Sequence, residues 1–330
     1  MCGDAVTAGV MHAGDMAGSA PGRGPSRHAV LVGPTASGKS AIAHEIARSS
    51  AGEFEVVSVD SMQVYRGMDI GTAKPTRAER DEVRYHLLDV ADPSEEFSVA
   101  AFQRAAREAL ADIESRGRRA LLVGGTGLYV QAVVDNFEVP GRYPEVRASL
   151  DAQPDTWGLH ADLMALDPLA ASRMERGNRR RILRALEVTI GSGRPFSSYG
   201  PGVDAYPDSA PIMLGLRPSV EDLDRRIEAR VAAMIEAGFV DEVARLAGAP
   251  AGMGSTAQQA LGYRELLRYL SADIELDEAA EQTRLRTRQF ARRQVRWFRR
   301  DPRIIWLDVD ETNRGRLADR VAELLGDPQP

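Results

Sequence analysis

Short apolar runs alternate with amphipathic stretches along most of the chain. Apolar runs bounded by glycine, proline and polar residues predict strands, and stretches with apolar residues at i, i+3 and i+4 predict helices. The predicted strands are residues 28–32, 54–60, 86–90, 120–123, 212–216 and 303–307; the predicted helices are residues 41–48, 98–116, 221–237, 257–270, 277–300 and 311–326. Strands that alternate with helices favour an α/β fold with a doubly wound parallel sheet.

This alternation lapses between residues 130 and 200, where proline, glycine and charged residues separate short helical patterns. The pattern predicts a smaller helical insertion domain (130–200) within a core formed by residues 28–129 and 201–330. Residues 1–27 are rich in Gly, Ala, Ser and Pro and have no basic stretch followed by an apolar one. We therefore expect a disordered leader and no signal peptide.

Composition narrows the class of protein. A net charge of −6 over 330 residues disfavours a protein that binds nucleic acid through bulk charge. No apolar run approaches the ~20 residues that span a bilayer, which disfavours a membrane role. The single cysteine, Cys2, excludes an internal disulfide framework. It fits a reducing compartment, so we expect a cytoplasmic protein.

Positive charge is nevertheless concentrated in two helical stripes. Residues 282–300 contain eight arginines and no acidic residue, with Phe290, Trp297 and Phe298 between them. Such stripes favour a polyanionic partner, with RNA as the natural candidate. The alternative is a pair of solvated helix faces with core aromatics. The arginines at helical spacing are Arg284, Arg288, Arg292, Arg296 and Arg300 in the first stripe and Arg173, Arg176, Arg180 and Arg184 in the second.

The most specific motif is G-P-T-A-S-G-K-S, which lies between a predicted strand and a predicted helix. This context is typical of a phosphate-binding P-loop, whose N–H groups and helix N-terminus converge on phosphate oxygens. Lys39 would neutralise phosphate charge, and the Ser40 hydroxyl would bind Mg²⁺. The predicted phosphate-binding residues are Gly33, Pro34, Thr35, Ala36, Ser37, Gly38, Lys39 and Ser40.

Two further polar features follow strands. Asp60 ends the second strand, and G-G-T-G-L-Y (124–129) follows the fourth. Ligands of such sheets bind beyond the carboxyl ends of the strands, so we expect these features and the P-loop in one crevice. A P-loop kinase of a small metabolite, with Asp60 as base, would fit this set. The fourth strand supplies no Walker-B carboxylate, however, and no N-K-x-D motif indicates a GTPase.

Several longer motifs resemble the tRNA dimethylallyltransferase (tRNA isopentenyltransferase) family, in order along residues 28–310. They comprise residues 33–40, 58–75, 124–129, 180–187, 259–265 and 287–299. The resemblance implies a P-loop NTPase-like parallel sheet flanked by helices. It also implies transfer of the dimethylallyl group from dimethylallyl diphosphate to the exocyclic N6 amine of the adenine 3′-adjacent to the anticodon, in tRNAs that read codons starting with U.

The resemblance further implies Mg²⁺ as cofactor, release of diphosphate, the tRNA anticodon stem-loop as partner, no membrane and a monomer. A small-metabolite kinase and a non-catalytic RNA-binding P-loop protein stay open as alternatives.

Site residues follow from the same resemblance. Asp60 is the expected base, by resemblance and by its placement, and Thr126 is expected near the nucleophile. Arg226 is expected at the diphosphate, with Arg230 as the alternative on the same helix face. The glutamines 63 and 259 carry donor–acceptor pairs suited to the edge of a base. The expected tRNA contacts are Asp60, Ser61, Met62, Gln63, Thr126, Arg147, Arg180, Arg181, Arg184, Gln259, Gly262, Tyr263, Arg264, Arg288 and Arg292.

Overall fold

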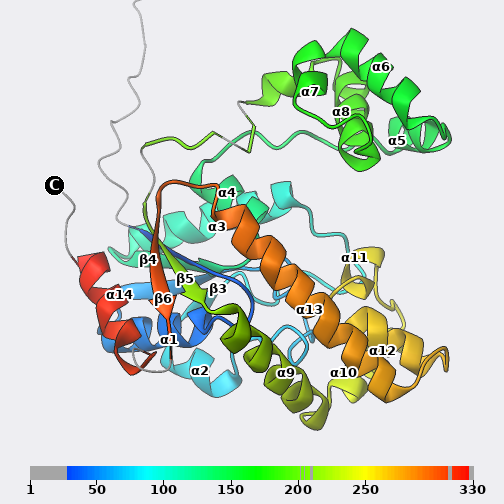
Figure 1. Cartoon of the computed structure of the whole chain (residues 1–330). Helices are drawn as coiled ribbons and strands as arrows, with labels where there is room; N and C mark the ends of the chain where they lie inside the picture. The colour runs from blue at the N-terminus through cyan, green and yellow to red at the C-terminus, as the bar shows by residue number, and fades with distance from the viewer. Residues whose placement is uncertain (1–27, 201, 204, 209–210, 311–313, 327–330) are drawn as a thin grey trace, which may run out of the picture.

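The chain forms a six-stranded sheet in the order β3-β2-β4-β1-β5-β6, and every pairing is parallel. The computed structural model describes residues 28–200, 202–203, 205–208, 211–310 and 314–326 (Figure 1), so the predicted leader lies outside the described residues. The parallel sheet confirms the predicted α/β class. The strands are β1 (Ala29–Val32), β2 (Phe54–Val59), β3 (Tyr85–His86), β4 (Arg119–Gly124), β5 (Ile212–Pro218) and β6 (Ile304–Val309).

Helices cover both faces of this sheet because alternate strand residues point to opposite sides. Ala29 and Leu31 of β1 face α1 (Lys39–Ser49) and α14 (Leu317–Gly326), which follows the short 3₁₀ turn η2 (Arg314–Arg316). Val30 and Val32 face the other core cluster. The helices that supply this second cluster are α3 (Val99–Ser115), α4 (Gly127–Val134), α10 (Phe239–Ala247), α12 (Tyr263–Leu270) and α13 (Leu276–Phe298).

A separate group of helices has a hydrophobic cluster of its own, built around Leu163 and Leu186. Figure 1 shows this group set off from the sheet. The predicted boundary at residue 130 falls inside α4, where Val130 is 2% exposed and packs in the sheet core. The division into domains stays a prediction. The group consists of α5 (Pro144–Asp151), α6 (Thr156–Leu166), α7 (Pro168–Ser172), α8 (Arg179–Ser192) and the 3₁₀ turn η1 (Phe196–Tyr199).

Three predicted elements differ from the structure. The third strand is only Tyr85–His86, because Leu87 and Asp89 adopt positive φ angles of 63° and 57° that turn the chain. The helix predicted over 257–270 is divided into α11 (Ser255–Gln258) and α12, with Gly262 at φ 85° between them. The last predicted helix begins later, at Leu317, and residues 311–313 lie outside the described part.

Two helices remain to be placed, one just before β3 and one beside α13. The short α2 (Arg77–Glu82) begins with a capping box in which Thr76 and Glu79 bond each other's backbone N–H. The longer α9 (Val220–Glu236) packs along α13 through Leu223, Ile227 and Ala291. In the described part of the chain, no helix combines the length and the apolar character needed to cross a bilayer.

Candidate active site

The sheet register brings the predicted site features together. Val32 and Val59 both pair with Gly124, so the next residues of β1, β2 and β4 leave the sheet at the same edge. A pocket of about 410 Å³ opens there. Its lining includes Asp60, Gly124 and the P-loop residues Thr35, Ala36, Gly38, Lys39 and Ser40. The expectation that the P-loop and Asp60 share one crevice is therefore confirmed.

The P-loop is a tight turn that runs directly into α1. Gly38 has a φ of 95°, which a residue with a Cβ rarely adopts. Gly33, Pro34 and Ser37 are buried behind the pocket and shape the turn from within. The Lys39 ammonium donates to the carbonyl of Pro34 at 3.2 Å. Burial, together with the nearby Arg230 charge and against the attraction of Asp60, lowers the pKa of Lys39 to about 8.

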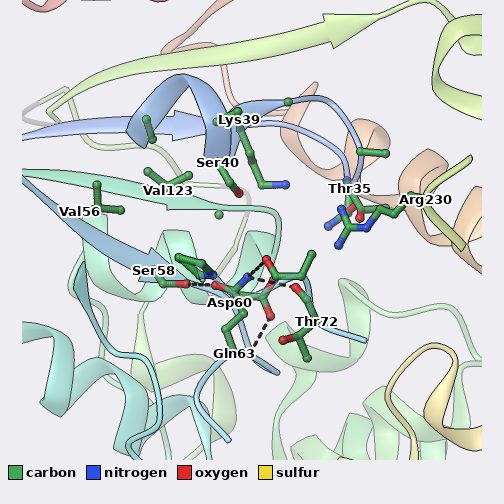
Figure 2. Close-up of a pocket in the computed structure, with 18 of the residues that line it drawn as sticks. Thr35, Lys39, Ser40, Val56, Ser58, Asp60, Gln63, Thr72, Val123 and Arg230 are labelled. Atoms are coloured by element: carbon green, nitrogen blue, oxygen red, sulfur yellow. Dashed lines mark hydrogen bonds between the residues drawn. The ribbon is translucent and has the colours of Figure 1, made fainter. Parts of the chain in front are cut away.

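Asp60 is held by the turn that follows β2. Its Oδ1 accepts the N–H of Met62 at 2.8 Å and the N–H of Gln63 at 3.3 Å. Among the described residues, both of its hydrogen bonds therefore use one oxygen, which leaves Oδ2 for a proton. Figure 2 shows Asp60 across the pocket from Lys39 and Ser40.

Two arginines of α9 add positive charge to this pocket. Arg226 donates to the carbonyl of Ser37 at 3.2 Å and pairs with Asp222. Arg230 lines the same pocket, where burial lowers its pKa and the charge of Asp60 opposes that shift. The sequence left the choice between these two arginines open, and the structure places both at the pocket.

Thr126 lies beside the turn that carries Asp60. Its Oγ1 accepts the N–H of Ser61 at 3.4 Å. The glycines on either side allow close packing: a Cβ on Gly125 would lie 2.3 Å from Gln294 Nε2, and a Cβ on Gly127 would lie 2.1 Å from Trp297 Cδ1. Side chains of α13 therefore pack directly against this turn.

Gln63, whose donor–acceptor pair the sequence analysis expects to suit the edge of a base, lines the pocket with its amide bonded to the protein itself. Its Oε1 accepts the Ser58 hydroxyl at 2.7 Å, and its Nε2 donates to the carbonyls of Thr72 and Ala73 at 3.1 and 3.2 Å. The amide thus fixes one wall of the pocket and is not presented to the edge of a base. The sequence carries one signal of this role. Ser58 stands two residues before Asp60, so the two side chains are on the same side of the chain, and the Ser58 hydroxyl can bond the Gln63 amide.

Glu242 of α10 holds the same pocket wall from behind. Its carboxylate accepts the N–H groups of Asp69, Ile70 and Gly71 at 3.0, 2.8 and 3.2 Å. The Tyr263 hydroxyl donates to it at 2.6 Å. Burial beside this carboxylate raises the pKa of Tyr263 well above its usual range.

Two of the predicted tRNA contacts are consequently wrong as direct contacts in this structure. Tyr263 is fully buried at 0% exposure, and Gly262 is buried against the ring of Phe239. Both sit in a motif whose glycine and aromatic residue build the core at the start of α12. Gln259 and Arg264, from the same motif, are exposed.

The arginines of α13 lie outside the pocket and have acidic neighbours. Arg288 pairs with Glu281 and Arg292 pairs with Asp224, both at 3.2 Å. Of the interleaved aromatics, Phe298 is buried in the core and Trp297 packs against it, so these two are not exposed stacking platforms. Phe290 lines the pocket.

The basic residues of the helical group are of two kinds, exposed ones and ones that pair within the group. Arg180 and Arg181 are exposed on α8. Arg184 is held by Glu187 at 2.8 Å and by the carbonyl of Pro140 at 2.8 Å. Arg147 pairs with Asp151 at 2.7 Å. Arg180 and Arg181 thus present free surface, whereas Arg184 and Arg147 also stabilise the group itself.

Comparison with known proteins decides the family. A family model described as IPP transferase matches residues 63–301. The chain belongs to the IPP transferase family. Its relatives include the tRNA dimethylallyltransferase of Salinispora arenicola, 49% identical over 88% of this chain and 84% of that protein. Another, from Kineococcus radiotolerans, is 48% identical over 89% of this chain and 95% of that protein.

Solved structures of this transferase family share the fold. The full-length tRNA isopentenylpyrophosphate transferase of Bacillus halodurans is 37% identical, with a TM-score of 0.65 over 92% of this chain and 97% of that one. A eukaryotic dimethylallyltransferase, described as acting on tRNA, is 25% identical, with a TM-score of 0.74 over 90% of this chain and 77% of that one. The predicted resemblance and the transferase class are confirmed.

Proposed function

We propose that this transferase moves the dimethylallyl group of dimethylallyl diphosphate to the N6 amine of the adenine 3′-adjacent to the anticodon. The observation that carries the proposal is one pocket in which a fixed carboxylate, Asp60, lies across from a P-loop and two arginines. Such a pocket supplies a base for the acceptor and cations for the leaving group. The names of the relatives supply the substrates.

The acceptor amine is a poor nucleophile, because its lone pair is delocalised into the adenine ring. As the N6 lone pair forms a bond to C1 of the dimethylallyl group, the C1–O bond breaks and diphosphate leaves with the electron pair. The N6 proton then passes to Oδ2 of Asp60, since Oδ1 is committed to the turn. Positioned general-base catalysis of this kind contributes about 10²–10⁴-fold.

Negative charge that develops on the leaving diphosphate meets the N-terminus of α1, Lys39, Arg226 and Arg230. Preorganised charges of this kind stabilise a transition state because they need no reorganisation. Val56, Tyr85 and Val123 line the same pocket and suit the branched hydrocarbon. The apolar and cationic parts of the pocket match the two ends of one substrate.

Mg²⁺ is proposed as the cofactor, with the Ser40 hydroxyl as its protein ligand. Among the described residues, no group of three His, Cys, Asp or Glu side chains forms a self-sufficient metal site. This fits Mg²⁺, which keeps several waters and binds through few protein ligands together with substrate phosphates. Bound there, the ion would neutralise diphosphate charge.

Docking of tRNA is proposed over the exposed arginines of α8 and α13. The adenine must leave its stack to reach a recessed pocket, which costs a few kcal/mol. Contacts between arginines and phosphates would offset that cost. We further propose a cytoplasmic monomer; light scattering of the purified protein tests the oligomeric state.

A labelling experiment tests the reaction. The protein is incubated with Mg²⁺, dimethylallyl diphosphate labelled in the allyl group, and an unmodified tRNA with adenine 3′ of the anticodon. Label is expected in that tRNA and not in a matched tRNA with guanine at the same position. Phosphorylation of a small metabolite at the expense of ATP, without any labelled tRNA, would support a kinase instead. Tight tRNA binding with neither reaction would indicate a non-catalytic RNA-binding protein.

A further inference from the structure

Gln294 is a buried side chain of α13 that contacts two separate loops of the pocket. Its Oε1 accepts the N–H of Thr35 at 2.8 Å, and its Nε2 donates to the carbonyl of Gly125 at 2.8 Å. The residue is 7% exposed and lines the pocket. One side-chain amide therefore joins the P-loop to the residue that precedes Thr126.

The turn around Thr126 is shaped to receive this face of α13. Gln294 and Trp297 are three residues apart, so they project from the same side of the helix. The Cβ distances of 2.3 Å at Gly125 and 2.1 Å at Gly127 show that neither glycine tolerates a side chain while these two residues are in place. Thr126, between the glycines, meets the turn of Asp60 through the N–H of Ser61.

At its other end, the Gln294 amide contacts the P-loop through Thr35. The Thr35 N–H is itself taken up by Gln294, so the bond acts by ordering the loop. The other N–H groups of a phosphate-binding loop contribute most when the loop is ordered before the ligand arrives. The Gln294 carbonyl orients the Thr35 peptide, and Arg226 bonds the same loop at Ser37. A side chain that merely filled space would need the volume of Gln294 and not its amide.

We propose that Gln294 is a positioning residue that fixes the P-loop and the Thr126 turn relative to each other. The diphosphate and the acceptor amine are thereby held at the separation the reaction needs. The catalytic part of this inference rests on the proposed function. The part that concerns the P-loop does not, because it can be measured with inorganic diphosphate alone.

The test compares Gln294→Met with Gln289→Met. Methionine keeps the length of the side chain and removes both hydrogen bonds, and Gln289 is exposed on the same helix. Loss of buried hydrogen bonds is expected to lower kcat/KM for dimethylallyl diphosphate by about 10- to 100-fold. Affinity for inorganic diphosphate, measured by calorimetry, should fall several-fold. The tRNA Kd should stay near wild type, the Tm should fall because two backbone groups lose a buried partner, and Gln289→Met should change none of these.

A double-mutant cycle keeps the inference testable whatever the stability of the methionine variant. Gly125→Ala places a methyl group against the Gln294 amide. The fall in kcat/KM that it causes should be at least ten-fold smaller in a Gln294→Ala background, because the collision is gone. Effects that simply multiply would overturn the proposal, as would a Gln294→Met variant with wild-type diphosphate affinity and turnover. If the wild type does not modify tRNA, the proposed function fails, and reduced diphosphate affinity in Gln294→Met still supports the P-loop bridge.

Discussion

The helices α9 and α13 pack side by side, yet Arg226 and Arg230 of α9 and Arg292 of α13 lie in opposite environments. Arg226 and Arg230 of α9 line the pocket, and the side chain of Arg226 is only 13% exposed. Arg292 of α13 faces outward with 57% of its side chain exposed, and it pairs with Asp224 of α9. Residue type and helical spacing are alike in the two sets. Burial separates them.

Burial changes what a charge can do. Within the pocket, the effective dielectric constant is low, so an arginine acts strongly on a charge a few ångströms away and salt screens it little. On the surface, one ion pair contributes little to stability. A row of exposed arginines acts on a polyanion by releasing its counterions, and this contribution depends steeply on salt. We therefore expect pocket variants to change turnover and surface variants to change the salt dependence of tRNA binding.

The largest effect is expected for Asp60→Asn. The amide oxygen can still accept the N–H groups of Met62 and Gln63, so the turn is kept while the base is lost. We expect kcat to fall by about 10²–10⁴-fold. The tRNA Kd should change less than two-fold in filter binding.

Asp92 provides a matched control for this variant. Its Oδ1 accepts the N–H of Ser94 in a similar turn, and Asp92 is not part of the pocket lining. Asp92→Asn should keep wild-type kcat. Near-normal turnover in Asp60→Asn would show that Asp60 is not the base.

The next effect is expected for Arg230→Gln. Loss of one preorganised cation at the leaving group should lower kcat/KM for dimethylallyl diphosphate by about 10²-fold. The salt dependence of tRNA binding should not change. Arg225→Gln is the control on the same helix, because the Arg225 side chain is 67% exposed. Equal losses in the two variants would contradict the distinction between buried and exposed arginines.

The sequence predicts the pocket edge well because the relevant residues follow strands directly. Gly33, Asp60 and Gly125 each come one residue after a strand end, and parallel strands bring such positions to one edge of the sheet. The P-loop adds a turn whose glycine at φ 95° is a local requirement. Local chemistry and sheet register were therefore sufficient here.

Other roles depend on partners that are distant in sequence. The amide of Gln63 is engaged by Thr72 and Ala73, and Tyr263 is buried against Glu242 of another helix. Gln294 bonds Thr35, which lies 259 positions earlier in the sequence, and Gly125, which lies 169 positions earlier. Periodicity shows that α13 has an inner face, and it does not show which loops that face meets. Such contacts are decided by tertiary packing.

A smaller effect is expected from pH, through Lys39. Its pKa of about 8 means that the free enzyme loses this charge as pH rises above 8. Bound diphosphate favours the protonated form, so binding above pH 8 requires proton uptake, and affinity should fall by up to about ten-fold per pH unit. Calorimetry of dimethylallyl diphosphate at pH 8.5, in buffers of different ionisation enthalpy, measures this uptake. Lys39→Arg should bind without it, and an absence of uptake in the wild type would contradict the lowered pKa.

The smallest effect is expected for two arginines of α13 outside the pocket, half-buried Arg288 and exposed Arg292, replaced together as Arg288→Gln with Arg292→Gln. Each phosphate contact contributes about 0.7–0.9 to the slope of log Kobs against log salt, so loss of two contacts should make the slope shallower by up to about 1.4–1.8. At saturating tRNA, kcat should be unchanged, because neither side chain lines the pocket.

Their acidic partners sharpen this last comparison. Because Glu281 and Asp224 hold the two arginines without RNA, tRNA must displace them, and Asp224→Asn should strengthen tRNA binding a few-fold at low salt. Arg320→Gln on α14 is the control, since its side chain is 60% exposed on a helix that packs on the opposite face of the sheet. An unchanged slope in the α13 double variant would mean that these arginines lie on a solvated helix face and make no phosphate contacts. The tRNA would then have to bind through other cations, with the exposed Arg180 and Arg181 of α8 as the next pair to replace.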